Sequence, residues 1–356
     1  MDAGRAGAPA RGPVRVALFG FGRVGRRMAA LLARRDGVEV VAVISRSLAG
    51  QPARSHVPEL PAGIVIVPDA ARALAAAHPD VVLHATVPTL DEAAGQITEV
   101  VRARAHVIST CEELAYPWVV HRDIAEALDR EAGQAGVSVL GTGVNPGFVF
   151  DALVLEVLSP RWHPTVVAVS RVTDASGFGP AVRDRLGLGL VPAAFEQRIS
   201  SGGIAGHIGF RESMDMIAAA LGTEVQRFEE SIKPLIADRA EDGLAQGTAA
   251  GLVQRAIGTC GGGLRFDFRL SLHVRPQLLG LEVLDSVSIE DGGATHEIQV
   301  RPASPPVETA AAQVVNAIPH ILAAEPGLRT RLDFGAPTPW MALPRAVARK
   351  GLGPAL

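Results

Sequence analysis

The sequence predicts an α/β protein in which a doubly wound parallel sheet is followed by a second domain of α+β type with an open, mostly antiparallel sheet. Residues 14–19 are almost continuously apolar, as expected for a strand buried on both faces of a parallel sheet. Strands and helices then alternate, which is the pattern of βαβ units. In the second half, strands follow one another directly, which favours an α+β arrangement.

In the first half, each predicted strand is a short apolar run, and each predicted helix repeats apolar residues three or four positions apart. The strands span residues 14–19, 38–44, 63–67, 81–85, 106–109 and 137–140, and the helices span residues 23–35, 70–77, 90–103 and 116–133. The segment 141–147 ends this pattern, because three glycines and a proline in seven residues continue neither a helix nor a strand.

The second half contains longer strands and a glycine-rich basic segment, residues 177–189, which we interpret as a mobile loop over a site. Helices are expected at residues 150–158 and 210–221, a helix or strand at 225–235, and strands at 166–172, 249–259, 264–273, 281–289 and 295–300. A helix over residues 308–323 is expected to pack back on the first domain. We therefore expect a disordered lead-in (residues 1–13), a first domain (14–148), a second domain (149–305) and a C-terminal segment (306–356).

Composition excludes several classes of function. The 356 residues are 48% apolar and 20% charged, with a net charge of −3, so neither a disordered chain nor a non-specific nucleic-acid binder is expected. The two cysteines, Cys111 and Cys260, form neither a disulfide framework nor a zinc site, and they suit a reducing cytoplasm. We expect no bound metal. No apolar stretch is long enough to cross a membrane, and none resembles a signal peptide.

The glycine motif Gly20-Phe-Gly22-Arg-Val-Gly25 follows the first strand and opens the first helix. Gly20 permits the tight turn, Gly22 lets the backbone approach a pyrophosphate, and Gly25 lets the helix lie close to the sheet. Arg23 and Val24 contribute free N–H groups at the helix N-terminus, which favours an anion. The motif predicts a Rossmann-type NAD(P)-binding domain; the alternative is a glycine-rich turn without a ligand.

The end of the second strand bears on the choice of coenzyme. Enzymes specific for NAD usually carry an acidic residue here, but no Asp or Glu occurs between Val40 and Gln51. Ser45 and Arg46 suit a 2′-phosphate instead, so we expect NADP to be accepted, with NAD left open; the alternative is a solvated Arg46. Thr86 follows another strand, where the ribose or phosphates of the coenzyme would pass.

Two adjacent acids, Glu112 and Glu113, follow the strand at residues 106–109, which should end beside the nicotinamide. Neighbouring helical residues do not share a face, so one acid should point into the cleft and the other away. The alternative is that both acids only favour the start of a helix through its dipole.

Further polar and aromatic residues are candidates for binding. Asn145, at the junction of the domains, could contact the nicotinamide carboxamide or the substrate, whereas Asp151 could cap the following helix. Phe148, Arg171 and His207 are candidates for substrate contacts, although such residues are more often structural. An amino-acid substrate would need a cation for its carboxylate, for which Arg171, Arg183 and Arg185 are available.

The segments GFGRVG (residues 20–25), HVISTCEELAYP (106–117), GTGVNPGFVFD (141–151) and GHIGFRESMDMIAAAL (206–221) resemble 2,4-diaminopentanoate dehydrogenase and the related native amine dehydrogenases, whose coenzyme domain is similar to that of dihydrodipicolinate reductase. The resemblance covers most of the chain from Val14. It implies NAD(P)H-dependent reductive amination of a ketone or aldehyde with ammonia, the reverse deamination of a small amine, and a catalytic glutamate within Thr110–Leu114. We favour Glu112 over Glu113. The sequence departs from the expected acid at Arg46.

Two other functions stay open. One is an oxidoreductase of the homoserine dehydrogenase or dihydrodipicolinate reductase type, which would offer a lysine or histidine as the acid; the lysines, Lys233 and Lys350, both lie outside the first domain. The other is a nucleotide-sensing protein without catalysis. The open second sheet leaves a face or an edge that a second copy could cover, and together with the resemblance it favours a homodimer.

Overall fold

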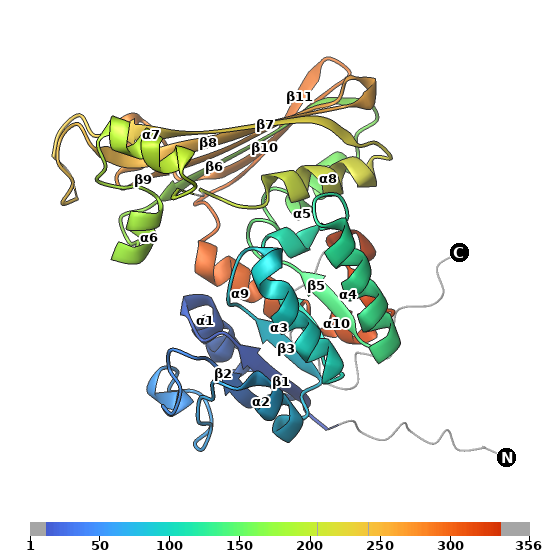
Figure 1. The fold of residues 1–356 in the computed structure, drawn as a ribbon. Helices are drawn as coiled ribbons and strands as arrows, with labels where there is room; N and C mark the ends of the chain where they lie inside the picture. The colour runs from blue at the N-terminus through green and yellow to red at the C-terminus, as the bar shows by residue number, and fades with distance from the viewer. Residues whose placement is uncertain (1–11, 205, 241, 336–356) are drawn as a thin grey trace.

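The computed structural model describes residues 12–204, 206–240 and 242–335. These residues form two six-stranded sheets, one above the other in Figure 1, with helices between and beside them. The predicted fold class is confirmed, because the first sheet is parallel throughout and the second is mostly antiparallel. Most of the predicted lead-in and the last 21 residues lie outside the described residues.

The first sheet has the strand order β12-β5-β4-β3-β1-β2. Its strands are β1 (Val14–Phe19), β2 (Val38–Ile44), β3 (Val81–His84), β4 (His106–Ser109), β5 (Ser138–Gly141) and β12 (Gly327–Arg329). The chain leaves β1 for β2 on one side and then returns to β3 on the other side. The carboxyl ends of β1 and β3 therefore flank the point where the strand order reverses, and ligands bind at this point in open α/β sheets.

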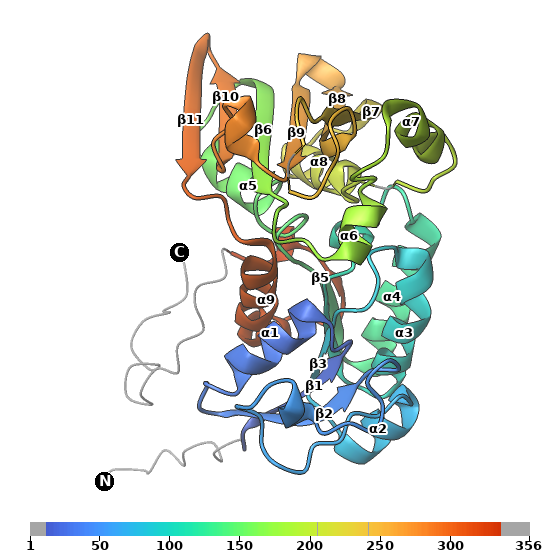
Figure 2. The same ribbon diagram turned by 90° about the vertical axis from the view of Figure 1, so that its left-hand side faces the viewer.

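Helices cover both faces of the parallel sheet. One face packs on α1 (Arg23–Leu32), α9 (Pro306–Asn316) and α10 (Ile318–Ala323), and the other packs on α2 (Ala70–Ala77), α3 (Leu90–Arg102) and α4 (Arg122–Ala135). In Figure 2, α1 and α9 lie on one side of β1 and β3, and α2, α3 and α4 lie on the other. Val16 and Leu18 point into the first core and Ala17 into the second, so alternate residues of one strand serve both faces.

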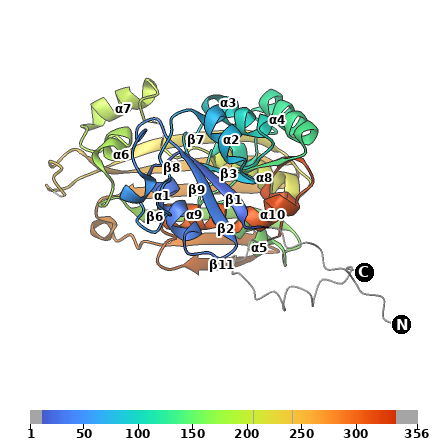
Figure 3. The same cartoon turned by 90° about the horizontal axis from the view of Figure 1, so that it is seen from below.

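The second sheet has the order β11-β10-β6-β9-β8-β7, in which only β6 and β9 run parallel. Its strands are β6 (Pro164–Asp174), β7 (Val225–Ile236), β8 (Ala249–Cys260), β9 (Arg265–His273), β10 (Asp285–Asp291) and β11 (Ala294–Val300). Viewed from below in Figure 3, its long strands run behind the parallel sheet of the first domain.

One face of the second sheet carries its core. The helices α5 (Ala152–Leu158), α7 (Pro192–Ser200) and α8 (Phe210–Ala220) contribute buried residues to that core. In Figures 1 and 2, α5 and α8 lie between this sheet and the first domain. Residues 206–209 lead into α8. They therefore lie near the carboxyl ends of the parallel strands, where Ile208 contacts Glu112 after β4. Single 3₁₀ turns complete the described chain: Ala53–Ser55, Glu113–Ala115, Gly261–Gly263, Pro276–Leu279 and Arg331–Asp333.

Several predicted elements differ from the structure. Residues 63–67 form only isolated bridges, Ile44 with Val67 and Pro52 with Val65. Val67 bonds to the end of β2, whereas the preceding residues bond to the loop at residues 50–53. The predicted helix at 116–133 begins at Arg122, after a turn. The segment 177–189 contains a helix, α6 (Pro180–Arg185), and residues 308–323 form two helices, α9 and α10, of which α9 packs against α1.

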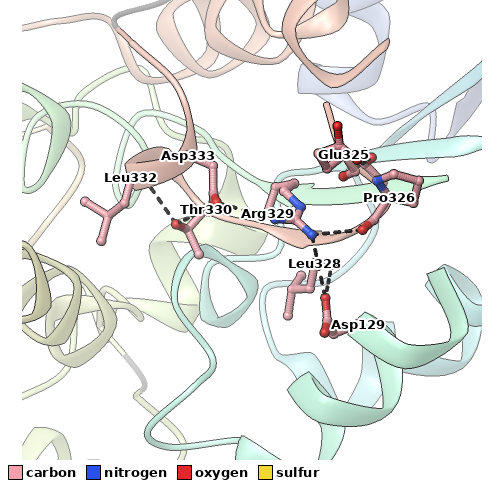
Figure 4. Close-up of polar contacts among 9 residues, drawn as sticks. Asp129, Glu325, Pro326, Leu328, Arg329, Thr330, Leu332 and Asp333 are labelled. Atoms are coloured by element: carbon pink, nitrogen blue, oxygen red, sulfur yellow. Dashed lines mark hydrogen bonds and ion pairs between the residues drawn. The ribbon is translucent and has the colours of Figure 1, made fainter. Parts of the chain in front are cut away.

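Strand β12 has no counterpart in the predicted elements. It pairs with β5 at the edge of the parallel sheet, and Leu328 N–H donates to Asp129 Oδ1 of α4 at 2.8 Å. Thr330 and Asp333 close the following turn as a capping box, as Figure 4 shows. No described helix is long and apolar enough to cross a membrane.

Candidate coenzyme and active site

The three glycines of the motif have different surroundings. A Cβ on Gly20, whose φ is +99°, would lie 2.1 Å from Ala85 O, and a Cβ on Gly25 would lie 2.1 Å from Gly20 O. These two glycines are therefore required by the turn and by the packing of helix on sheet. A Cβ on Gly22 meets no atom within 4 Å, and its φ of −74° suits any residue. Neither backbone conformation nor protein packing explains Gly22, whereas the close approach of a pyrophosphate does.

A cavity of about 450 Å³ lies beside this loop. Its lining residues come from the carboxyl ends of β1, β2 and β3 and from α2 and α3: Phe19, Gly20, Phe21, Gly22, Ile44, Ser45, Arg46, Ser47, Pro68, Ala70, Ala85, Thr86, Gln96 and Glu99. It therefore brings together the predicted Gly20, Gly22, Ser45, Arg46 and Thr86. Arg23, Val24 and Gly25 form the start of α1, next to it.

Arg46 is exposed at this cavity and makes no ion pair with any residue that the structure describes. A free guanidinium at the end of β2 suits a 2′-phosphate. The carboxylate of Glu99, which the sequence analysis did not single out, lines the same cavity from α3. The cavity is therefore lined by both a cation and an anion.

The side chain of Thr86 is hydrogen-bonded to His84. His84 Nε2 lies 2.8 Å from Thr86 Oγ1 and 3.0 Å from Gln96 Oε1, and its Nδ1 lies 2.8 Å from Ser109 Oγ. Burial lowers the pKa of His84 to about 4, so the ring is neutral at physiological pH. The sequence analysis missed His84 and Gln96, although His84 stands two residues before Thr86.

The two adjacent acids point in different directions. Glu113 Oε2 accepts the N–H of Leu90, the first residue of α3, at 2.6 Å and lies 3.1 Å from His121 Nε2. Glu112 points to the second domain, where its Oε2 accepts the N–H of Ile208 at 3.1 Å. Glu113 therefore stabilises a helix N-terminus, and Glu112 is the acid at the junction of the domains.

The surroundings of Glu112 favour its neutral form. Burial raises the pKa of Glu112 to about 8, the Ile208 N–H and the charge of Arg185 act in the opposite direction, and Glu212 and Glu113 add to the rise. The side chain keeps 32% of its surface exposed, so it is only partly removed from water. A carboxyl group with a pKa near the operating pH is suited to acid–base chemistry.

His207 lies next to Glu112, with its Nδ1 3.6 Å from Glu112 Oε2. Burial lowers the pKa of His207 to about 3, and the charge of Arg171 lowers it further, so the ring is neutral. The ring packs against Phe150 and Phe210, and its Nε2 is buried without a partner among the described residues. A neutral histidine of this kind is a poor proton donor, which disfavours a histidine acid at this site.

Two polar atoms at the same junction lack partners within the described chain. They are Asn145 Oδ1 and Thr142 Oγ1, both buried, in the loop that follows β5. Buried polar atoms are normally hydrogen-bonded, so these two fit a ligand with donor groups such as the nicotinamide carboxamide. With the cavity and Gly22, they make the described residues a good fit for a nicotinamide dinucleotide. Sequence analysis selected Asn145 and missed Thr142.

The remaining candidates have other surroundings. Asp151 accepts the N–H groups of Gly147 at 2.7 Å and Ala152 at 2.5 Å, so it caps α5. Phe148 is partly buried against the core of the second domain. Arg171 requires a correction: it is 2% exposed, and its Nη1 lies 3.1 Å from Asp285 Oδ1. Its guanidinium is thus paired inside the second sheet, and it is not available to a substrate carboxylate.

Comparison with known proteins identifies the family. Residues 148–350 match the model of the 2,4-diaminopentanoate dehydrogenase C-terminal domain, and residues 16–140 match the saccharopine dehydrogenase NADP binding domain. A 2,4-diaminopentanoate dehydrogenase of Acetoanaerobium sticklandii is 33% identical over 333 residues, which cover 91% of this chain and 94% of that protein. The chain belongs to the 2,4-diaminopentanoate dehydrogenase family.

Solved structures agree with this family in fold. An amine dehydrogenase from Mycobacterium smegmatis aligns with a TM-score of 0.80 and 24% identity, covering 91% of this chain and 97% of the other. The myo-inositol 2-dehydrogenase of Lactobacillus plantarum aligns with a TM-score of 0.54 and 12% identity, covering 87% and 88%. As a member of the family, the chain is an NAD(P)-dependent dehydrogenase of the amine dehydrogenase type.

Proposed function

We propose that the protein catalyses the NAD(P)H-dependent reductive amination of a small ketone or aldehyde with ammonia, and the reverse deamination of the amine. The observation that carries this proposal is the position of Glu112, a carboxyl group with a pKa raised by burial at the junction between a dinucleotide fold and the second domain. The name of the Acetoanaerobium sticklandii relative supports an amine as the reduced substrate.

The role of Glu112 follows from its charge. Condensation of ammonia with a carbonyl gives a carbinolamine, which loses water to form an iminium cation. As a carboxylate, Glu112 stabilises this cation, and as a carboxylic acid it donates the proton that the departing water needs. A positioned acid–base group of this kind contributes about 10²–10⁴-fold in rate.

The surrounding residues define the rest of the site. Ile208 N–H fixes one oxygen of Glu112, and the aromatic rings of Phe150 and Phe210 keep the neighbourhood of His207 apolar. An apolar cleft strengthens the attraction between carboxylate and iminium. When bound, the reduced nicotinamide supplies the hydride, and Asn145 and Thr142 would hold its carboxamide.

The substrate class depends on whether a cation is free to bind a carboxylate. Arg171 is paired with Asp285, and Arg183 Nη1 is paired with Asp242 Oδ2 at 2.6 Å. Arg185 makes no ion pair within the described chain, and its charge acts on Glu112. We therefore assign to Arg185 any preference for keto acids over simple ketones.

The test of the proposed function is an assay of NAD(P)H oxidation with ammonium and two carbonyl panels, simple ketones or aldehydes and keto acids. We expect oxidation of the coenzyme to require both ammonium and the carbonyl, and Arg185→Ala to weaken only the keto-acid reactions. Coenzyme oxidation that proceeds equally without ammonium would indicate an alcohol-forming oxidoreductase. Coenzyme binding without turnover on either panel would indicate a sensing protein.

The preference for NADP over NAD is assigned to Arg46. Arg46→Ala should remove one charged hydrogen bond to the 2′-phosphate. This should reduce the binding free energy of NADPH by about 1.5–3 kcal/mol, or the affinity by about 10- to 150-fold. The dissociation constants of NADPH and NADH for the wild type and Arg46→Ala, measured by fluorescence titration, check this. A ratio of the two constants that Arg46→Ala leaves unchanged refutes the assignment.

We further propose a homodimer formed through the outer face of the second sheet. Figures 1 and 2 show no described helix over this face. The face carries half-buried apolar residues beside the Arg255–Asp267 ion pair, among them Val166, Val253 and Ile257. Sedimentation velocity at micromolar concentration should give a dimer, and Ile257→Asp should shift it toward the monomer. A wild-type monomer would refute this proposal.

A further inference from the structure

The side chain of Gln254 reaches from the middle of β8 to the turn that precedes α8. Gln254 is fully buried, and its Oε1 accepts the N–H of His207 at 2.6 Å while its Nε2 donates to His207 O at 2.7 Å. The second hydrogen of Nε2 goes to Glu230 Oε1 at 2.8 Å. Because Glu230 can accept but not donate when ionised, this contact also fixes which end of the amide faces which partner.

The turn itself, residues 206–209, is confined from both sides. A Cβ on Gly206, with φ +62°, would lie 2.4 Å from Gln254 Oε1, and a Cβ on Gly209, with φ +108°, would lie 2.5 Å from Pro146. Gln254 thus packs against the Gly206 end of the turn, and Pro146, in the loop after β5, packs against the Gly209 end. Both backbone polar groups of His207 are bound by a single side chain, which leaves the next N–H, that of Ile208, directed to Glu112 at 3.1 Å.

We propose that Gln254 is a positioning residue of the active site, which holds the turn 206–209 so that Ile208 N–H donates to the Glu112 carboxylate across the junction of the two domains. This inference rests on the proposed function for its catalytic consequence. The contact itself is independent of turnover. The hydrogen bonds of Gln254 go to His207 and Glu230, so it acts on Glu112 through the backbone of His207 and Ile208.

The N–H of Ile208 matters because the other neighbours of Glu112 act in different directions. Burial and the carboxylates of Glu212 and Glu113 disfavour its charge, Arg185 favours it, and the neutral ring of His207 lies 3.6 Å away. A hydrogen bond to the charged form stabilises that form. Loss of the hydrogen bond from Ile208 N–H should therefore keep Glu112 protonated to a higher pH.

The direct test measures the titration of Glu112 in the coenzyme-free protein by carboxyl-¹³C NMR of glutamate-labelled samples, with the signal assigned by its loss in Glu112→Gln. In Gln254→Met, which keeps the volume and removes the amide, we expect the midpoint to rise by about one pH unit. The value of kcat/KM at pH 7 should then fall about tenfold and recover toward that of the wild type at high pH, with the dissociation constant of NADPH unchanged.

Two further variants separate positioning from stability. Leu252→Ala removes a buried side chain from the same strand and face, so it should lower the melting temperature without moving the Glu112 titration. The double variant Gln254→Glu/Glu230→Gln exchanges donor and acceptor and keeps an acceptor for His207 N–H, so its midpoint should lie closer to that of the wild type than the midpoint of Gln254→Met.

The outcomes distinguish this inference from the proposed function. An unchanged Glu112 titration in Gln254→Met, or an equal shift in Leu252→Ala, overturns the positioning role of Gln254. A shifted titration with unchanged kcat/KM at every pH supports the contact between the turn and Glu112 but overturns the catalytic role of Glu112.

Discussion

Glu112 and Glu113 show how one step along the chain changes the chemistry of a carboxyl group. Glu113 accepts the N–H of Leu90 at the start of α3, where the helix dipole favours a negative charge. Glu112 lies against the second domain and loses much of its hydration, which raises its pKa to about 8. The sequence predicts that the two acids diverge, but the direction of each depends on α3 and on residues 206–209, which are distant in sequence.

Gly22 and Gly25 of the coenzyme loop can be compared directly by substitution with alanine. Gly22→Ala should leave the free energy of unfolding nearly unchanged, because the new Cβ meets no protein atom, while NADPH binding weakens by at least tenfold through the loss of close approach to the pyrophosphate. Gly25→Ala places a Cβ 2.1 Å from Gly20 O and should cost about 1–3 kcal/mol of stability. Urea unfolding and coenzyme titration measure both effects.

An equal loss of stability in both variants would contradict this division of roles. Wild-type coenzyme affinity in Gly22→Ala would also contradict it, because a Cβ at position 22 would then not obstruct the pyrophosphate.

At the scale of elements, the bounds of strands and helices are predicted best where the apolar residues follow a single pattern. The strands β1, β2 and β4 and the helix α2 have their predicted bounds, since short apolar runs and helical spacing are local properties. Residues 63–67 have the composition of a strand but form only isolated bridges, and β12 is too short to show a period. Gln254 could not be selected either, because it lies within an ordinary strand pattern and its function depends on a turn 47 residues away in sequence.

Strand β12 depends on the contact with α4 drawn in Figure 4. Asp129 Oδ1 accepts Leu328 N–H, and Arg329 lies near the same carboxylate. Asp129→Ala should lower the free energy of unfolding by about 1–2 kcal/mol, since it leaves a partly buried N–H without its acceptor. Urea unfolding measures this loss, and the dissociation constant of NADPH should not change. Unchanged stability would show that β12 is held by its pairing with β5 alone.

At the scale of the whole molecule, the active-site carboxyl group links stability to pH. The pKa of Glu112 is raised above its usual value of 4.5, so the folded protein binds this proton more tightly than the unfolded chain does. The contribution of Glu112 to stability therefore falls as pH rises from about 4.5 to about 8 and is constant above that range.

Glu112→Gln removes this pH-dependent cost. Relative to the wild type, the variant should gain about 1 kcal/mol between pH 5 and pH 9, a reduced figure because about a third of the side chain remains in water. Urea unfolding at the two pH values measures the difference. Glu113→Gln, which weakens the contact with Leu90 N–H, should instead be less stable than the wild type at both. A gain for Glu112→Gln that is independent of pH would contradict the raised pKa.

The central claim, that the Glu112 carboxyl group acts on the reacting C=N bond, is tested most directly by the turnover of Glu112→Gln and Glu113→Gln in ammonia-dependent NAD(P)H oxidation. The account predicts that Glu112→Gln lowers kcat by at least about 100-fold with the coenzyme dissociation constant within about twofold of the wild type, while Glu113→Gln retains most of its activity. A Glu112→Gln enzyme within about tenfold of the wild type, or a larger loss in Glu113→Gln, would contradict it.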